Sequence, residues 1–271
     1  MSIRVRLLLG YVAVVVILMA SGALIIVPMS DELEGAVRRD AQALARALRA
    51  KVEQAVRARI QTIEAFAGTD QPLQVALATS NSAFASRGSD AEIRASIEEA
   101  DARWLEGSST AFRNTLLRND VARSLQRIQR FHRTNDGRSV FAELFVTNRY
   151  GANVGQTGLT EDYDQKGEGW WDAAWEHGTW ASPDVELDDS AGVYSLDIGV
   201  RVDGPDRKRL GVIKAVLNIT DIAQTIDAFG AQGGVPGAFL QLVDADGRIV
   251  HHQDNPKLFR SDVSGQRAVQ R

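Results

Sequence analysis

A long, mostly apolar run without any charged residue lies near the start of the chain. The 21 residues from Leu7 to Val27 carry no charge, and a helix of that length would span roughly 32 Å, close to the ~30 Å hydrocarbon core of a bilayer. Arg4 and Arg6 precede the run and acidic residues follow it, which predicts that residues 1–6 are cytoplasmic and the rest of the chain lies outside. A cleaved signal peptide is the alternative, but its apolar core is usually only about 7–15 residues long. We therefore predict a transmembrane helix over residues 7–27.

A helical pattern follows over residues 30–68. This segment is rich in Ala, Arg, Gln, Glu and Leu, and its apolar residues recur mostly every three or four positions, which gathers them on one face of a helix. These apolar positions are Leu33, Val37, Ala41, Leu44, Leu48, Val52, Ala55, Ile63 and Phe66. We interpret the segment as a stalk that leaves the membrane and forms a homodimer with the stalk of a second copy. The alternative is a stripe that packs only against the chain's own domain.

Helical signals continue as far as about residue 131, after a stretch containing Gly and Pro ends the stalk. Residues 72–79 are predicted as a short helical turn, and residues 80–88 as a polar loop. Ser89 and Glu92 have the spacing of a capping box, which marks the start of another helix. A further helix is predicted up to Phe131, and we interpret its arginines as a solvated face rather than a nucleic-acid surface.

At residue 139 the pattern changes from helical to strand-like. The predicted strands are 140–147, 152–154, 193–202 and 210–219, and the predicted short helices are 169–177 and 220–229. Turn-forming residues separate the strands, at 148–151 and at 203–206. Long helices followed by an antiparallel sheet with short helices predict an α+β fold. Residues 230–237 are predicted as a linker, and a new hairpin is predicted after it.

Composition and charge exclude several classes of structure and function. The chain has 271 residues, of which 44% are apolar, too many for a disordered chain. The absence of cysteine excludes disulfides and thiolate metal sites. The net charge is −4, but residues 1–133 carry +4 and residues 134–271 carry −8. A basic helical half is therefore followed by an acidic half, and a general nucleic-acid binder is not expected.

Four runs of sequence, in this order of elements, resemble a double Cache sensor domain. The first is ELFVTNRYGANVGQT at 143–157, and the second is DYDQKGEGWW at 162–171. The third, LGVIKAV at 210–216, is similar to the closing strand of the membrane-distal lobe of that family. The fourth, LVDADGRIV at 242–250, resembles the start of the membrane-proximal lobe.

The resemblance implies the extracytoplasmic sensor of a bacterial transmembrane receptor. Such sensors belong to chemoreceptors, sensor histidine kinases of two-component systems, and cyclic-di-GMP or phosphatase receptors. It implies a PAS-like antiparallel-sheet Cache lobe over 69–230 and the start of a second lobe over 231–271, which makes the chain an N-terminal fragment. A small molecule would bind in the distal lobe, between its sheet and the Trp-Trp helix, and signal through the stalk. An effector module would follow in the full-length protein.

The resemblance also implies where a ligand would be held. In amino-acid-binding members a Tyr is followed five residues later by an Arg, and then by a Trp, a Tyr and an Asp. Tyr163 and Trp170 match this pattern, whereas Glu168 stands at the Arg position, Trp171 at the Tyr position and Ala173 at the Asp position. An Arg there would hold a carboxylate by a bidentate pair, and Glu168 would repel one. An α-amino acid is therefore a poor candidate ligand.

The same stretch combines aromatic and acidic side chains, which suits a cationic ligand such as a polyamine or a quaternary amine. The candidate ligand-binding residues are Tyr163, Glu168, Trp170, Trp171, Asp172, Tyr194 and Asp197. The alternative is that the Trp residues are core and the carboxylates a solvated rim. A metal site at residues 184–189 lacks the spacing of a calcium loop, so neither a metal nor a cofactor is expected.

No catalytic motif is present, so this segment is not expected to be an enzyme. Two other classes stay open beside the sensor. One is an anchored scaffold or interaction protein without a small ligand. The other is an extracytoplasmic enzyme.

Overall fold

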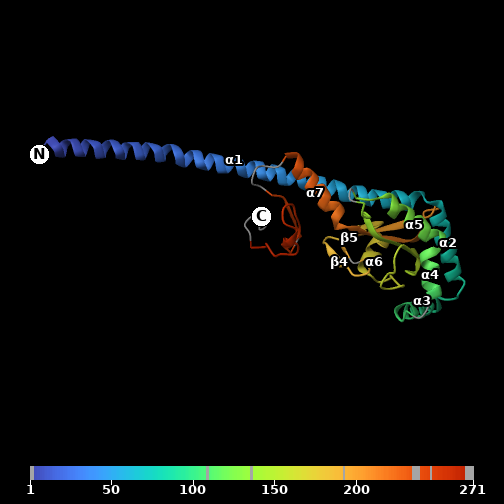
Figure 1. Cartoon of the computed structure of the whole chain (residues 1–271). Helices are drawn as coiled ribbons and strands as arrows, with labels where there is room; N and C mark the ends of the chain where they lie inside the picture. Colours follow the sequence, from blue (N-terminus) through green and yellow to red (C-terminus); the bar gives the residue numbers. More distant parts are fainter. Residues whose placement is uncertain are drawn as a thin grey trace. The chain divides into compact units, whose positions relative to one another are not determined.

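The computed structural model describes residues 3–107, 110–134, 137–191, 193–233, 239–244 and 246–265; for residues 3–34, 232 and 233 it describes the backbone alone. Helix α1 (Ile3–Thr69) opens the chain and contains the predicted stalk helix (Figure 1). The chain divides into two compact units, Met1–Lys51 and Val52–Arg271. The predicted membrane span, 7–27, lies outside the residues whose side chains are described. Within those that are described, no helix is long and apolar enough to cross a membrane.

The second unit is built on a six-stranded antiparallel sheet in the order β2-β1-β6-β5-β3, with β4 also paired to β5. The strands are β1 (Phe141–Asn148), β2 (Asn153–Gln156), β3 (Thr179–Ala181), β4 (Glu186–Asp188), β5 (Val193–Asp203) and β6 (Arg209–Asn218). The sequence predicted the β1–β2 hairpin and the long β5–β6 pair, and the structure confirms both. Together with the helices they make the fold α+β.

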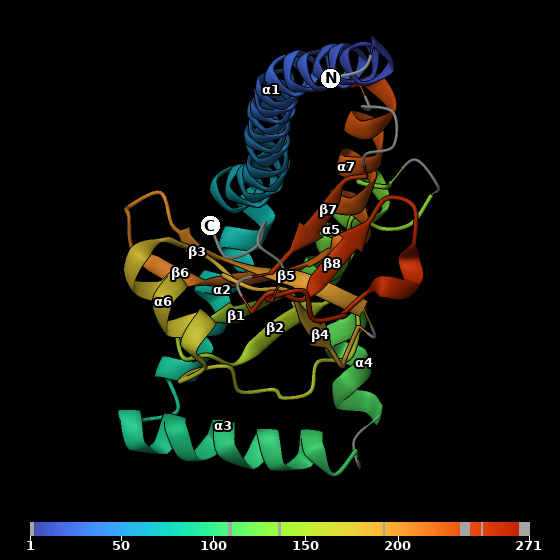
Figure 2. The same cartoon turned by 90° about the vertical axis from the view of Figure 1, so that its left-hand side faces the viewer.

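Six further helices belong to this unit: α2 (Gln71–Ala85), α3 (Asp90–Leu105), α4 (Thr110–Arg118), α5 (Asp120–Phe131), α6 (Gly169–His177) and α7 (Ile219–Gly233). Helices α2 and α5 lie on one face of the sheet and α6 lies on the other (Figures 1 and 2). A hairpin of β7 (Gln241–Val243) and β8 (Ile249–His252), with a short 3-10 turn at Pro256–Leu258, follows α7.

One glycine of β2 and one of β5 let helices approach the two faces of the sheet. A Cβ added at Gly155 of β2 would meet Val121 of α5 at 2.8 Å, and one added at Gly199 of β5 would meet Ala174 of α6 at 2.9 Å. Real Cβ contacts are longer than this, so both helices need glycine opposite them.

The helix boundaries before the sheet differ from the prediction. A short helical turn was predicted at 72–79 and a polar loop at 80–88. Helix α2 instead runs from Gln71 to Ala85 and includes most of the predicted loop. Its polar residues bind the sheet: Asn81 Nδ2 donates to Leu210 O at 2.8 Å and Asn81 Oδ1 accepts from Arg149 N at 3.0 Å. Contacts with distant strands therefore stabilise a stretch whose composition is typical of a loop.

The helix predicted up to Phe131 is two helices, because Asn119 interrupts it. The Asn119 side chain accepts from Ala122 N at 2.8 Å as the N-cap of α5, and its Nδ2 donates to Val154 O at 2.7 Å. Strands β3 and β4 were not predicted, since each has only three residues. The capping box of Ser89 and Glu92 is confirmed.

The predicted linker at 230–237 is partly wrong, since α7 continues to Gly233, and residues 234–238 lie outside the described part of the chain.

Candidate ligand-binding site

A pocket of about 270 Å³ opens on the α6 face of the sheet. Its floor consists of two cross-strand rows whose order follows from the strand register. In the first row Glu143 and Asp197 flank Val216, and in the second Phe145 and Gly199 flank Lys214. Alternate residues of a strand point to the same face, so Phe145, Lys214 and Asp197 all reach the pocket.

Two walls stand on this floor. Strand β4 and the turn after it supply Glu186, Leu187, Asp188, Asp189 and Ser190. The opposite wall consists of the loop at 160–165 and the first turn of α6, which supplies Glu168 and Trp170. Asp101 of α3 fixes that loop, because its Oδ1 accepts from the backbone N of Tyr163 at 2.8 Å and of Asp164 at 3.1 Å. The pocket therefore lies between the sheet and the Trp-Trp helix, where the sequence resemblance implied it.

Acidic side chains dominate the pocket. Of the described residues that line it, seven carry carboxylates and one, Lys214, carries an ammonium. The acidic residues are Glu161, Asp162, Glu168, Glu186, Asp188, Asp189 and Asp197. Burial, with the nearby carboxylates of Asp101 and Asp164, raises the pKa of Asp162. The excess of negative charge in the lining favours a positively charged occupant.

Lys214 is already paired inside the pocket. Its Nζ lies 2.8 Å from Asp197 Oδ2, and the side chains are only 16% and 24% exposed. The same Nζ lies 5.3 Å from the centroid of Trp170 and 5.9 Å from that of Phe145. The cation–π position over these rings is therefore filled by the protein's own ammonium.

A further carboxylate, that of Glu143, lies beneath the lining. Glu143 is only 3% exposed, and Ser190 Oγ lies 2.6 Å from Glu143 Oε2 and 2.7 Å from Asp188 Oδ1, so its single hydroxyl proton is donated to one of these two carboxyl groups at a time. Burial raises the pKa of Glu143 to about 7, and the charges of Asp188 and Asp197 act in the same direction, against Ser190 and Lys214. The floor thus contains a carboxyl group that takes up or releases a proton near neutral pH.

Three of the residues predicted from the sequence line this pocket, namely Glu168, Trp170 and Asp197. The other four do not. Asp172 is exposed on the outer side of α6, and Tyr194 packs against Phe259, with ring centroids 4.5 Å apart.

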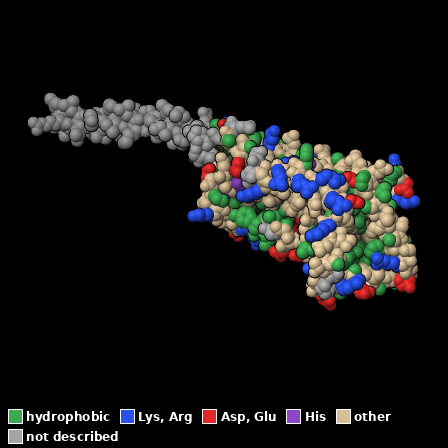
Figure 3. Space-filling model, turned by 45° about the vertical axis from the view of Figure 1, so that its right-hand side comes forward, with side chains coloured by type: hydrophobic (Ala, Val, Ile, Leu, Met, Phe, Trp, Pro, Cys, Tyr) green, Lys and Arg blue, Asp and Glu red, His purple; other side chains and the backbone are tan. Residues whose placement is uncertain are grey.

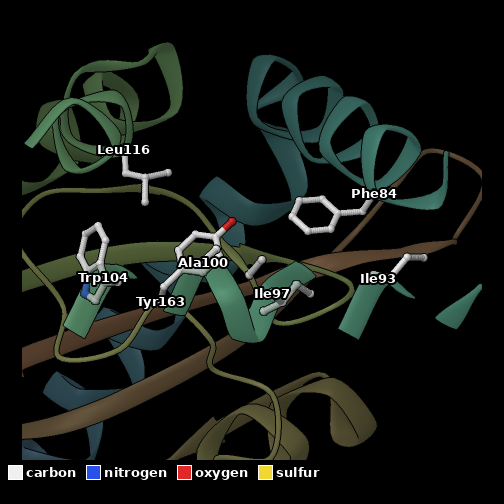
Figure 4. Packing of buried hydrophobic residues seen from close by; sticks show 8 residues of the cluster. Phe84, Ile93, Ile97, Ala100, Trp104, Leu116 and Tyr163 are labelled. Atoms are coloured by element: carbon white, nitrogen blue, oxygen red, sulfur yellow. The ribbon is translucent and has the colours of Figure 1, made fainter. Parts of the chain in front are cut away.

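Trp171 and Tyr163 are core residues. Trp171 is 2% exposed; its indole N–H donates to Thr147 Oγ1 at 2.7 Å and its ring stacks on Trp175. Tyr163 lies beside Trp104 in a cluster with residues of α2, α3 and α4 (Figure 4). Trp171 therefore has the core position that the alternative interpretation of the sequence gave to the Trp residues, whereas a core position for Tyr163 was not predicted.

The sequence did not single out Glu143, Phe145 or Lys214 as site residues. A signal was present for the two charged ones, because each interrupts a run of strand residues that are otherwise mostly apolar. A buried charge in such a run needs a partner, and each of these two faces the pocket. The runs 143–157 and 210–216 carry the resemblance to the double Cache family, which by itself gives no role to Glu143 or Lys214.

In the described part of the chain, no three acidic or histidine side chains converge on a point where they could hold an ion. Residues 184–189 instead contain β4, which pairs with the edge of β5. On the face shown in Figure 3, Lys and Arg side chains are spread among uncharged groups, and five of the six arginines between Arg113 and Arg133 are exposed.

No family model and no curated protein matches the chain. Solved structures do match. The ligand-binding domain of the Pseudomonas aeruginosa PAO1 amino acid chemoreceptor PctB with L-Arg is 18% identical, covering 62% of this chain and 64% of that chain, with a TM-score of 0.36. The ligand-binding domain of the Pseudomonas fluorescens chemoreceptor CtaA with L-alanine is 17% identical over 60% and 66%, with a TM-score of 0.36. The V. cholerae histidine kinase DctB sensor domain is 14% identical over 80% and 69%, with a TM-score of 0.38.

The chain thus spans just under two thirds of the PctB domain's length. The matched proteins are described as ligand-binding or sensor domains, the class of domain that the sequence resembles. At these identities and TM-scores, the function of this chain has to be argued from its own residues.

Proposed function

We propose that this chain is the extracytoplasmic sensing part of a membrane-anchored bacterial receptor and that it binds a small cationic ligand in the pocket on the α6 face. The pocket's charge is the observation that carries the proposal. Seven carboxylates line it, and its one ammonium, that of Lys214, is already paired with Asp197. A cation is the occupant that this arrangement stabilises.

The aromatic side chains have a smaller part in this proposal than the sequence suggested. Lys214 occupies the space over Trp170 and Phe145, so a ligand cation meets carboxylates first. Glu168, at the position of the family's Arg, is exposed at the start of α6 and makes no capping hydrogen bond there. Its carboxylate is thus available to the pocket.

A route from the pocket to α1 supports a signalling role. Strand β6 carries Lys214 and continues directly into α7. Asp221, in the first turn of α7, accepts two hydrogen bonds from the Arg59 guanidinium of α1, both at 2.8 Å. A shift of β6 on ligand binding would therefore reach the stalk helix through a bidentate ion pair.

Anchoring and dimerisation belong to the same proposal. The charge-free run at 7–27 has the length of a membrane span, and the basic residues before it favour a cytoplasmic N-terminus. The stalk stripe includes Val37, whose side chain is 58% exposed. We propose that this stripe pairs with the stalk of a second copy.

A zwitterionic ligand is the second candidate, because Lys214 could exchange Asp197 for a ligand carboxylate while the acidic wall holds an amino group. This alternative predicts that removal of Lys214 abolishes binding. The cationic proposal predicts the opposite.

A thermal-shift screen of the 271-residue chain in detergent tests the proposal. We expect 1,4-diaminobutane and choline to raise the melting temperature, whereas 1,4-butanediol, a neutral analogue of the diamine, has no effect. Stabilisation by amino acids alone would contradict the cationic ligand, and no stabilisation by any compound would favour the scaffold reading.

A further inference from the structure

Three buried polar side chains on the α6 side of the sheet have hydrogen-bonding atoms without a partner. They are Glu143 of β1 and Asn153 and Gln156 of β2, which are 3%, 2% and 0% exposed. The unpartnered atoms are Glu143 Oε1, Asn153 Oδ1, and both Oε1 and Nε2 of Gln156. Buried polar atoms are normally hydrogen-bonded. Four buried atoms without a partner on one face of the sheet therefore indicate that a further group forms hydrogen bonds with them.

The strand register places all three side chains under the pocket. Gln156 pairs with Phe145, and Asn153 pairs with Thr147. Glu143, Phe145 and Thr147 alternate along β1, and a register shift between Val146 and Thr147 brings Asn153 as well as Gln156 opposite a residue of this set. Directly paired residues point to the same face of a sheet. Phe145 itself lines the pocket.

Hydrogen bonds connect the same side chains to the lining. Asn153 Nδ2 donates to Thr160 Oγ1 and to Asp162 O, both at 3.0 Å. Ser190 Oγ donates to Glu143 Oε2. Thr160, Asp162 and Ser190 are pocket residues, so the unpartnered atoms form the layer directly below the lining.

The chemistry of these atoms favours a ligand group that donates hydrogen bonds. Asn153 uses its Nδ2 for two acceptors, so its free atom is an oxygen. Glu143 Oε1 is a second free oxygen and Gln156 Oε1 a third, while Gln156 Nε2 is the single free donor. A primary ammonium has three N–H donors, whereas a quaternary ammonium has none.

We propose that Glu143, Asn153 and Gln156 form a floor that receives the N–H groups of a primary ammonium, so that the pocket selects primary amines over quaternary ones. This inference rests on the proposed function, because it assumes that a cation enters the pocket. The three acceptors are closed to solvent in this structure, so the ligand reaches them by parting the lining residues above. A site that hydrogen-bonds N–H groups discriminates strongly against an analogue that lacks them.

Isothermal titration of the 271-residue chain in detergent tests this, with two probes that carry the same two charges on the same four-carbon chain. One probe is 1,4-diaminobutane, and the other is its hexamethyl bis-quaternary analogue. We expect the diamine to bind at least about tenfold more tightly. Gln156→Leu should reduce this ratio to near one, while Gln126→Leu, a half-buried glutamine of α5 on the other face, should leave it unchanged.

The side chain of Gln156 makes no hydrogen bond, so its replacement by leucine removes none. A second variant, Glu143→Gln, keeps the shape of the floor and should also weaken the diamine more than the quaternary analogue. Equal binding of both probes to the unsubstituted chain would overturn the selectivity while leaving the cationic pocket intact. A preference for the diamine that persists in both variants would overturn the assignment of this selectivity to Glu143 and Gln156. Binding of neither probe would contradict the proposed function itself.

Discussion

Single residues of the pocket floor determine how the site responds to charge and to pH. Glu143 and Lys214 are charged side chains on adjacent strands of one sheet face. Lys214 has a partner in Asp197, whereas one oxygen of Glu143 has none. Because their surroundings differ, we make one prediction about stability, for Glu143, and one about ligand affinity, for Lys214.

Replacing Glu143 should stabilise the protein at alkaline pH. Burial raises the pKa of Glu143 to about 7 from its usual 4.5. The folded state therefore keeps a proton that the unfolded state loses, and stability falls as pH rises from about 4.5 to 7. Glu143→Gln removes this loss, so we expect it to be more stable than the unsubstituted chain by roughly 3 kcal/mol at pH 8 and nearly equal at pH 4.5.

Thermal unfolding followed by circular dichroism at both pH values measures this difference. Glu99→Gln, at a side chain that is 74% exposed on α3, is the matched control and should change neither value. A Glu143→Gln effect of the same size at both pH values would show that the carboxyl group does not titrate between them.

Removing Lys214 should increase the affinity for amines. Lys214→Met leaves Asp197 without its ammonium and frees the space over Trp170. An added cation can take that place, and we expect 1,4-diaminobutane to bind about tenfold more tightly, which corresponds to ~1.4 kcal/mol. Lys208→Met, at an 80% exposed lysine outside the pocket, is the control. Loss of binding in Lys214→Met would support a zwitterionic ligand instead.

At the scale of elements, the sequence predicted those parts of the fold that depend on local pattern. The capping box at Ser89, the helix 169–177 and the paired strands β5 and β6 are where the pattern placed them. The pattern failed where distant contacts decide the structure, as in α2, where Asn81 bonds to Leu210 of β6 and to Arg149 in the turn after β1, both more than 60 positions away.

In the candidate site, too, the local sequence pattern does not reveal residues that distant contacts bring together. Glu168, Trp170 and Asp197 could be selected from the sequence because aromatic and acidic residues gather near them. Gln156 and Asn153 could not, since nothing in a polar strand residue indicates which face it occupies until the register is known. The partners of Lys214 likewise depend on which strands are neighbours.

The contact between α1 and α7 should be energetically coupled. Arg59 and Asp221 are 28% and 9% exposed and share two hydrogen bonds. We expect a double-mutant cycle of Arg59→Ala and Asp221→Ala to give a coupling free energy of roughly 2 kcal/mol in unfolding experiments. The exposed pair Arg123–Asp120 on α5 is the control and should show no measurable coupling. Independent effects of the two substitutions would argue against this route to the stalk.

For the molecule as a whole, we predict a dimer that the stalk holds together. Val37 of α1 and Val75 of α2 are both 58% exposed. Val37→Glu places a charge in the stripe and should shift the detergent-solubilised chain from dimer to monomer in analytical ultracentrifugation. Val75→Glu, equally exposed but outside the stripe, should leave the dimer intact. A monomeric unsubstituted chain would contradict the stalk interface.

The central claim is that a small cation binds among the carboxylates of the pocket, and direct titration tests it. We predict that 1,4-diaminobutane binds the chain at one site per protomer, and that Glu186→Gln with Asp188→Asn weakens binding at least about tenfold. Glu98→Gln with Glu99→Gln on α3, which removes the same charge elsewhere, should weaken it far less. Equal affinities in the two double variants, or no binding to the unsubstituted chain, would contradict the claim.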